Sequence, residues 1–193
     1  MRRTKILIYG FGPYGGFGHN ITQAILRRLG RRRGLATRVF TTRFSRGMFL
    51  TALRQHAPQI VIGLGQDRTG RKLRLERKAV NRMGRRGEVG RPIDPKGPAQ
   101  LFVNLHLPET TATTVAYDAG SYVCNFSMYW MLRACRQTGC RFAFIHVPRH
   151  YDVAAATAYL RLAVRVAKGL RLGPGPSGYS NNGRPRPIRS HRA

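Results

Sequence analysis

Hydrophobic and polar positions along this chain follow two periods, one typical of strands and one typical of helices. Short apolar or alternating runs predict strands, and apolar positions that recur every three or four residues predict helices. The strand pattern occurs at residues 5–9, 35–41, 59–64, 73–78, 100–106, 113–117 and 141–147. The helix pattern occurs at residues 21–29, 47–57, 123–137 and 153–168.

The order of these elements predicts the fold class. Strands that alternate with helices favour an α/β fold, here a single three-layer α/β/α domain with a mostly parallel twisted sheet. The first helix has Asn20 as its expected N-cap and Gly30 as its end. We expect the domain to span residues 1–172, because residues 173–193 are rich in Gly, Pro, Ser, Asn and Arg and predict a disordered basic tail.

Length and cysteine content narrow the class of protein. The 193 residues suffice for one full core, and no apolar run approaches the roughly 20 residues that a membrane span needs. The apolar run after Met1 is too short for a signal peptide, so we read it as the first strand. The three cysteines cannot all pair within the chain, and without an export signal they favour a reducing cytoplasm.

The charge of the chain is unusual, with 35 Lys and Arg against 7 Asp and Glu and a formal net charge of +28. Such a balance attracts nucleic acid and other polyanions. The arginines are spread along nearly the whole chain, whereas a nucleic-acid module concentrates them on one element, so a compositional bias is favoured. We still expect weak, non-specific polyanion binding. The scarcity of acids makes each carboxylate a stronger functional candidate.

A cysteine at the start of an apolar helix is the first candidate for chemistry. A small Gly-containing turn, residues 118–122, delivers Cys124 to the first turn of the helix predicted over 123–137. The unpaired N–H groups of a helix start carry partial positive charge, which favours the nucleophilic thiolate. We expect Cys135 and Cys140 to be small core residues instead.

Two further residues complete a candidate triad. His146 ends the strand predicted over 141–147, and sites form at the carboxyl ends of strands in open α/β sheets. Glu76 lies on the opposite face of its strand from Leu73 and Leu75. A carboxylate that orients an imidazole beside a thiolate would give a Cys-His-Glu triad. The alternatives are a structural histidine and a salt bridge to one of the many arginines.

The glycine-rich run after the first strand has two interpretations. Residues 10–15 match G-x-G-x-x-G, which is typical of dinucleotide sites. However, Pro13 removes a backbone donor, no acid follows within about 20 residues, and Arg38 would at best favour NADP. We therefore favour a loop that presents Phe11, Tyr14 and Phe17 as an apolar wall, and rank an NADP-dependent oxidoreductase third among the functions considered.

Taken together, three separated segments within residues 5–150 resemble the pyroglutamyl peptidase I (pyrrolidone-carboxylate peptidase) family. The first is Gly10–Gly16 with Asn20, similar to the family's Gly-Phe-x-Pro-Phe-Gly-Gly loop and its Asn. The second is Gly65-Gln66 followed by Glu76–Asn81. The third is Ala119–Asn125 followed by Phe144–Pro148.

The resemblance implies a cytoplasmic cysteine exopeptidase that releases N-terminal pyroglutamyl residues from blocked peptides through a thioester. No metal or other cofactor is implied, and the cysteines and histidines lack zinc-site spacing. The implied catalytic residues are the nucleophile Cys124, the general base and acid His146, and the orienting carboxylate Glu76. The implied substrate-binding residues are Phe11 and Tyr14, which would flank the lactam ring, and Gln66 close to it, with Arg86 near the developing charge.

The chain also departs from the family pattern. Tyr14 replaces a common Phe, Gly12 replaces a frequent acid, and Asp67-Arg68-Thr69 replaces a Gly-rich run. The family often forms homodimers or tetramers, so a homo-oligomer is expected by resemblance, although the charge of +28 opposes it. The main rival function is a repurposed family member that binds RNA or a ribonucleoprotein through its Arg-rich surface and tail.

Overall fold

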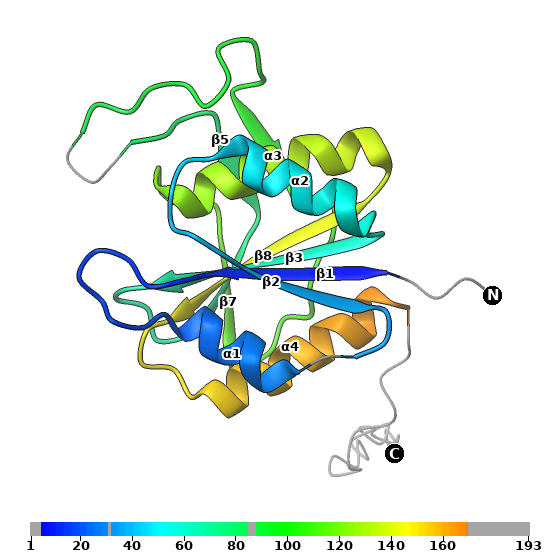
Figure 1. Ribbon diagram of the computed structural model, residues 1–193. Coiled ribbons are helices and arrows are strands. Elements are labelled where there is room, and N and C mark those ends of the chain that lie inside the picture. The colour runs from blue at the N-terminus through cyan, green and yellow to red at the C-terminus, as the bar shows by residue number, and fades with distance from the viewer. Residues whose placement is uncertain (1–4, 31, 85–87, 170–193) are drawn as a thin grey trace, which may run out of the picture.

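A six-stranded sheet forms the centre of the molecule (Figure 1). The computed structural model describes residues 5–30, 32–84 and 88–169. In the order β2-β1-β3-β8-β4-β7, the first four strands run parallel, and β4 and β7 run opposite to β8. The strands are β1 (Ile6–Phe11), β2 (Leu35–Phe40), β3 (Ile60–Asp67), β4 (Leu73–Glu76), β7 (Thr113–Ala116) and β8 (Arg141–Pro148). The predicted α/β class with a mostly parallel sheet is confirmed.

Helices cover both faces of this sheet (Figure 1). In that view α2 (Arg46–His56) and α3 (Val123–Thr138) lie above the sheet, and α1 (Ile21–Leu29) and α4 (Val153–Ala167) lie below it. Alternate residues of the central strands β1, β3 and β8 therefore enter two separate apolar cores, one per face. This burial on both faces explains the nearly continuous apolar runs of the central strands.

The first helix begins and ends where the sequence predicts. Asn20 is its N-cap, and the side-chain Oδ1 accepts a hydrogen bond of 3.0 Å from the Thr22 N–H. The chain leaves the helix at Gly30, whose φ of 69° lies in the left-handed region that glycine tolerates best.

The strand predicted over residues 73–78 is divided in the structure. It ends at Glu76, and β5 (Lys78–Val80) then pairs with β6 (Gln100–Phe102) in a separate two-stranded sheet. Arg77 joins the two sheets. Its N–H donates to the carbonyl of Ala116 at the end of β7, in the large sheet, and its carbonyl accepts from the N–H of Val103, just after β6 of the small sheet. Between β5 and β6, an isolated bridge joins Met83 and Arg91.

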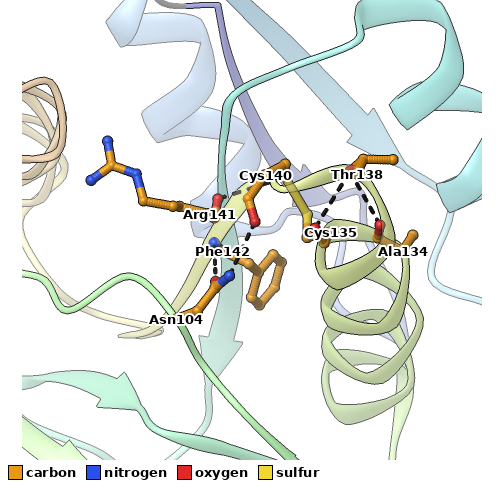
Figure 2. The surroundings of a disulfide bond; sticks show 7 residues. All are labelled: Asn104, Ala134, Cys135, Thr138, Cys140, Arg141 and Phe142. Atoms are coloured by element: carbon orange, nitrogen blue, oxygen red, sulfur yellow. Dashed lines mark hydrogen bonds between the residues drawn. A yellow bond between two sulfur atoms is a disulfide. The ribbon is translucent and has the colours of Figure 1, made fainter.

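Cys135 and Cys140 form a disulfide at the end of α3, which corrects the expectation of two unpaired core cysteines (Figure 2). Gly139 ends the helix with φ 71°, and the Cys140 N–H turns back to donate to the Cys135 carbonyl at 3.0 Å. Asn104 holds the segment after the bond, accepting from Phe142 N–H and donating to the Cys140 carbonyl. Disulfides are uncommon in reducing compartments, so the cytoplasmic location stays a prediction.

Other expectations concern the surface and the ends of the chain. No helix within the described residues has the length and apolar character required to cross a bilayer. The predicted basic tail, residues 173–193, lies outside the described residues, as does the expected domain boundary at 172. Both stay predictions.

Candidate active site

Strand periodicity places three polar side chains on one face of the sheet. Leu73 and Leu75 belong to the core between the sheet and helices α1 and α4. The intervening Arg74 and the following Glu76 therefore point to the opposite face, toward α3. In the antiparallel pairing of β4 with β8, Arg74 lies directly opposite His146. Directly opposed residues of neighbouring strands are in contact range, so this face carries a guanidinium, a carboxylate and an imidazole together.

The imidazole of His146 is paired with the Glu76 carboxylate. The distance from Nδ1 to Glu76 Oε1 is 2.8 Å, and both residues are buried, with exposed fractions of 6% and 1%. When Nδ1–H donates to the carboxylate, Nε2 is left to face the opposite way. Glu76 thereby fixes the orientation of the ring.

Cys124 reaches the Nε2 side of this ring from the first turn of α3. A Cβ atom placed on Gly65 would lie 2.8 Å from the Cys124 sulfur and 2.9 Å from His146 Nε2, so these two atoms share one small space. Gly65 on β3 pairs in register with His146 on β8. The missing side chain at Gly65 therefore makes the room in which the sulfur and the ring meet. Cys124 is partly exposed and is not in a disulfide.

The charges around His146 favour its protonated form. Burial lowers the pKa of this imidazole, but Cys124 and Glu76 together raise it more, to about 9. The imidazolium is therefore favoured at neutral pH, beside the Cys124 sulfur. A thiolate–imidazolium pair supplies both a nucleophile and a proton donor.

Backbone donors lie next to the sulfur. Tyr122 occupies the N-cap of α3 without a side-chain hydrogen bond to the first turn. Among the described residues, no hydrogen-bond partner is found for the N–H groups of Val123, Cys124 and Asn125, and the first backbone bond of the helix comes from Phe126. Free N–H groups at a helix start can stabilise a developing oxyanion.

A cleft of about 1130 Å³ opens above these groups. Five of the residues that the sequence predicts for the site line this cleft: Phe11, Tyr14, Gln66, Cys124 and His146. Glu76 lies behind the imidazole, away from the cleft. The loop after β1 meets the loop before α3 across the cleft, with the Tyr14 and Tyr122 rings 6.3 Å apart. Phe17, the third residue of the expected apolar wall, packs against Tyr14 but does not line the cleft.

Gln66 lines the cleft and carries a buried amide donor. Its Oε1 accepts from the Ile21 N–H at the start of α1, at 3.0 Å, which fixes the orientation of the amide. Its Nε2 is buried without a well-formed hydrogen bond to a described residue, although the Tyr14 hydroxyl lies close enough to Gln66 for the amide to affect its pKa. Burial and the nearby Cys124 raise the pKa of Tyr14, so its hydroxyl stays neutral. Buried polar atoms of this kind are normally satisfied by a partner or a ligand.

Arg74 is a residue of the site that the sequence reasoning missed. Its Nη2 donates to Glu76 Oε1 at 2.8 Å and lies 3.5 Å from His146 Nδ1, and its Nη1 lies 3.3 Å from Asp67 Oδ2. The available signal was the strand alternation, which puts Arg74 on the same face as Glu76.

The remaining expectations have different outcomes. Arg86 lies outside the described residues. Within the described residues there is no group of three or more His, Cys, Asp or Glu side chains arranged to hold a metal ion, and the metal-free reaction stays a prediction. Gly10 has a packing role, because a Cβ there would lie 2.7 Å from the Thr22 hydroxyl of α1.

Comparison with known proteins identifies the family. The family model of the pyroglutamyl peptidases matches residues 4–160 of this chain. The chain belongs to the pyroglutamyl peptidase family. This confirms the resemblance seen in the three separated segments, and with it the expectation of a cysteine peptidase of this family.

Individual members of the pyroglutamyl peptidase family are similar in sequence and structure. The pyrrolidone-carboxylate peptidase of Thermococcus litoralis is 32% identical over 167 residues, which cover 75% of this chain and 76% of the relative. That of Bacillus subtilis is 31% identical over 172 residues, covering 76% and 79%. The solved structure from Thermococcus litoralis has a TM-score of 0.78 at 25% identity, covering 86% of this chain and 93% of that one. Pyroglutamyl peptidase I from Bacillus amyloliquefaciens has a TM-score of 0.79 at 25% identity, covering 86% and 98%.

Proposed function

We propose that this protein is a cysteine exopeptidase that hydrolyses the bond after an N-terminal pyroglutamyl residue, with Cys124, His146 and Glu76 as its catalytic triad. One observation carries the proposal. A sulfur, an imidazole and a buried carboxylate from three separate segments converge at the wall of one cleft. The names of the relatives, pyrrolidone-carboxylate peptidases, support the substrate class.

In the first half of the reaction, the Cys124 thiolate attacks the carbonyl carbon of the pyroglutamyl residue. The C=O electron pair moves to oxygen, and the free N–H groups at the start of α3 stabilise the resulting oxyanion. As the tetrahedral intermediate collapses, the C–N bond breaks and the His146 imidazolium gives its Nε2 proton to the leaving amine. The shortened peptide leaves, and a pyroglutamyl thioester remains on Cys124.

The second half regenerates the enzyme. His146, now neutral, takes a proton from water as the water oxygen attacks the thioester carbonyl. Collapse of the second intermediate expels the Cys124 thiolate and releases free pyroglutamate. Glu76 keeps the ring oriented in both steps and stabilises its cationic form. We also propose that Arg86 assists with charge stabilisation, as the family spacing implies.

The cleft walls support selectivity for the uncharged lactam. Phe11 and Tyr14 supply aromatic surface for the flat ring, and the Gln66 amide at the cleft wall would donate to a lactam oxygen. A peptide with an ordinary amino terminus would bury a charged ammonium beside these groups without a partner, which costs several kcal/mol.

The test is release of free pyroglutamate from a synthetic blocked peptide. Cys124→Ala and His146→Ala should each lower the rate by at least about 10³-fold, because removing one triad member disables the whole unit. His150→Ala, which alters an exposed histidine four residues from His146, is the control and should retain the wild-type rate. Full activity in folded Cys124→Ala would contradict the proposal.

A further inference from the structure

Two arginines at the cleft form no ion pair with an acid of the described residues. Arg68 follows β3, Arg149 follows β8, and both line the cleft. A 2.8 Å hydrogen bond from the Arg149 N–H to the Asp67 carbonyl joins the two segments. None of the ion pairs between described residues includes either guanidinium.

One aromatic ring holds both side chains in place. The guanidinium carbons of Arg149 and Arg68 lie 4.5 Å and 5.6 Å from the centroid of the Phe17 ring. Phe17 in turn packs against Tyr14 in the cleft wall, with ring centroids 5.6 Å apart. Cation–π contacts of this kind position a charge without neutralising it. Two positive charges near one ring also repel each other, and an anion bound between them would relieve that repulsion.

The acids of the same cleft are already occupied. Asp67 and Glu76 both interact with Arg74. Asp118 accepts from the Gly120 N–H at 2.8 Å through its own Oδ1. None of these described acids forms an ion pair with Arg68 or Arg149, so both guanidinium groups are available to an anion in the cleft.

We propose that Arg68 and Arg149 form a subsite for a carboxylate of the peptide on the leaving side of the scissile bond. The inference rests on the proposed function. The pyroglutamyl ring is uncharged, so the carboxylate must belong to the rest of the substrate. Its source is an acidic side chain after the scissile bond or the free C-terminus of a short peptide. The subsite also gives a role to Asp67-Arg68-Thr69, where the sequence departs from the family pattern.

Matched substrates test the subsite and its two sources. The first pair is the amide of pyroglutamyl-glutamate and the amide of pyroglutamyl-glutamine, which differ only in charge. The second pair is pyroglutamyl-alanine with a free carboxylate and its amide. In at least one pair the anionic member should have a kcat/KM about three- to tenfold higher at low salt, since partly exposed ion pairs contribute modestly. The difference should lie in KM and should shrink at high salt.

Variants attribute the preference to the two arginines. In Arg68→Gln/Arg149→Gln the anionic and neutral members of each pair should reach nearly equal kcat/KM. Arg161→Gln removes one positive charge from an exposed position on α4 and should retain the preference. Equal kcat/KM within both pairs in the wild type, or a preference that survives in the double variant, would overturn the subsite alone. Failure to hydrolyse any of the four substrates would overturn the proposed function and the subsite with it.

Discussion

Glu76 holds two cationic partners through a single oxygen. Its Oε1 lies 2.8 Å from both His146 Nδ1 and Arg74 Nη2, and its Oε2 is buried without a partner among the described residues. The guanidinium therefore competes with the imidazole for the charge of the carboxylate. Its own positive charge lies close to Nδ1 as well. Both effects disfavour the imidazolium, so Arg74 opposes the influence of Glu76 on His146.

This arrangement predicts the alkaline limit of activity. In the proposed mechanism the His146 imidazolium protonates the leaving amine, and its pKa is raised to about 9 by Cys124 and Glu76 against the effect of burial. The ring therefore stays protonated at neutral pH, and kcat/KM should fall as the pH rises through about 9. In Arg74→Gln the imidazolium loses a nearby positive charge, so the alkaline limb should move to higher pH.

The measurement is kcat/KM on a neutral pyroglutamyl substrate as a function of pH. The rate of Arg74→Gln at neutral pH should stay within about tenfold of wild type, because Arg74 acts through Glu76 and does not contact the reacting atoms. Arg71→Gln, at an exposed position of the preceding loop, should leave the profile unchanged. A shift of the Arg74→Gln limb to lower pH would show that the guanidinium supports the imidazolium instead of opposing it.

At the scale of elements, the register of β3 with β8 creates the space in which the Cys124 sulfur and the His146 ring meet. Gly65→Ala would place a methyl group less than 3 Å from the Cys124 sulfur and from two atoms of the His146 ring. Both side chains must move, and displacements of about 1 Å at reacting groups cost about 100-fold in rate. We expect kcat/KM to fall by at least about 100-fold while unfolding free energy falls by only about 1–3 kcal/mol.

A second glycine provides the control for Gly65→Ala. Gly47 lies in α2 and has open space around its Cβ position, so Gly47→Ala should keep the wild-type rate. It should also stabilise the fold by about 0.5–1 kcal/mol, because alanine favours a helix more than glycine. Rates and denaturant unfolding of both variants separate the two effects. Near-normal activity in Gly65→Ala would show that the sulfur and the ring do not need this space.

The same elements show how far the sequence alone could be interpreted. The periodicity located α1 with both of its ends, because Asn20 and Gly30 are strong local signals. It also put Glu76 on the face away from Leu75, which is where the structure has it. It did not reveal the change of sheet at Arg77, since alternation continues while the pairing partner changes. The Cys135–Cys140 bond depends on the turn at Gly139, and the contacts of Arg74 depend on register between distant strands.

At the scale of the whole molecule, positive charge is widely distributed. Besides the arginines of the cleft, an open hollow of about 410 Å³ is lined by Arg32, Arg33, Arg38 and His56 near the start of β2 and the end of α2, with no carboxylate in its lining. Burial and the neighbouring Arg38 lower the pKa of His56, which keeps it neutral at pH 7. The charge of +28 is therefore a property of many surfaces, and it opposes the homo-oligomer that stays a prediction by resemblance.

A distributed charge predicts RNA binding of a particular kind. A random 20-nucleotide RNA should bind at low salt through several alternative positions, and its affinity should fall by at least about tenfold between 50 and 200 mM salt because bound counterions are released. Arg32→Gln/Arg33→Gln should weaken this binding only slightly, since other arginines replace the lost contacts.

Fluorescence anisotropy measures the affinity, and the peptide assay is run in parallel. At an RNA concentration near the dissociation constant, hydrolysis of a neutral pyroglutamyl amide should continue within about twofold of its normal rate, because RNA spread over several positions leaves the cleft open in most complexes. Binding that resists 200 mM salt, in a protein without peptidase activity, would instead favour the repurposed RNA-binding member of the family.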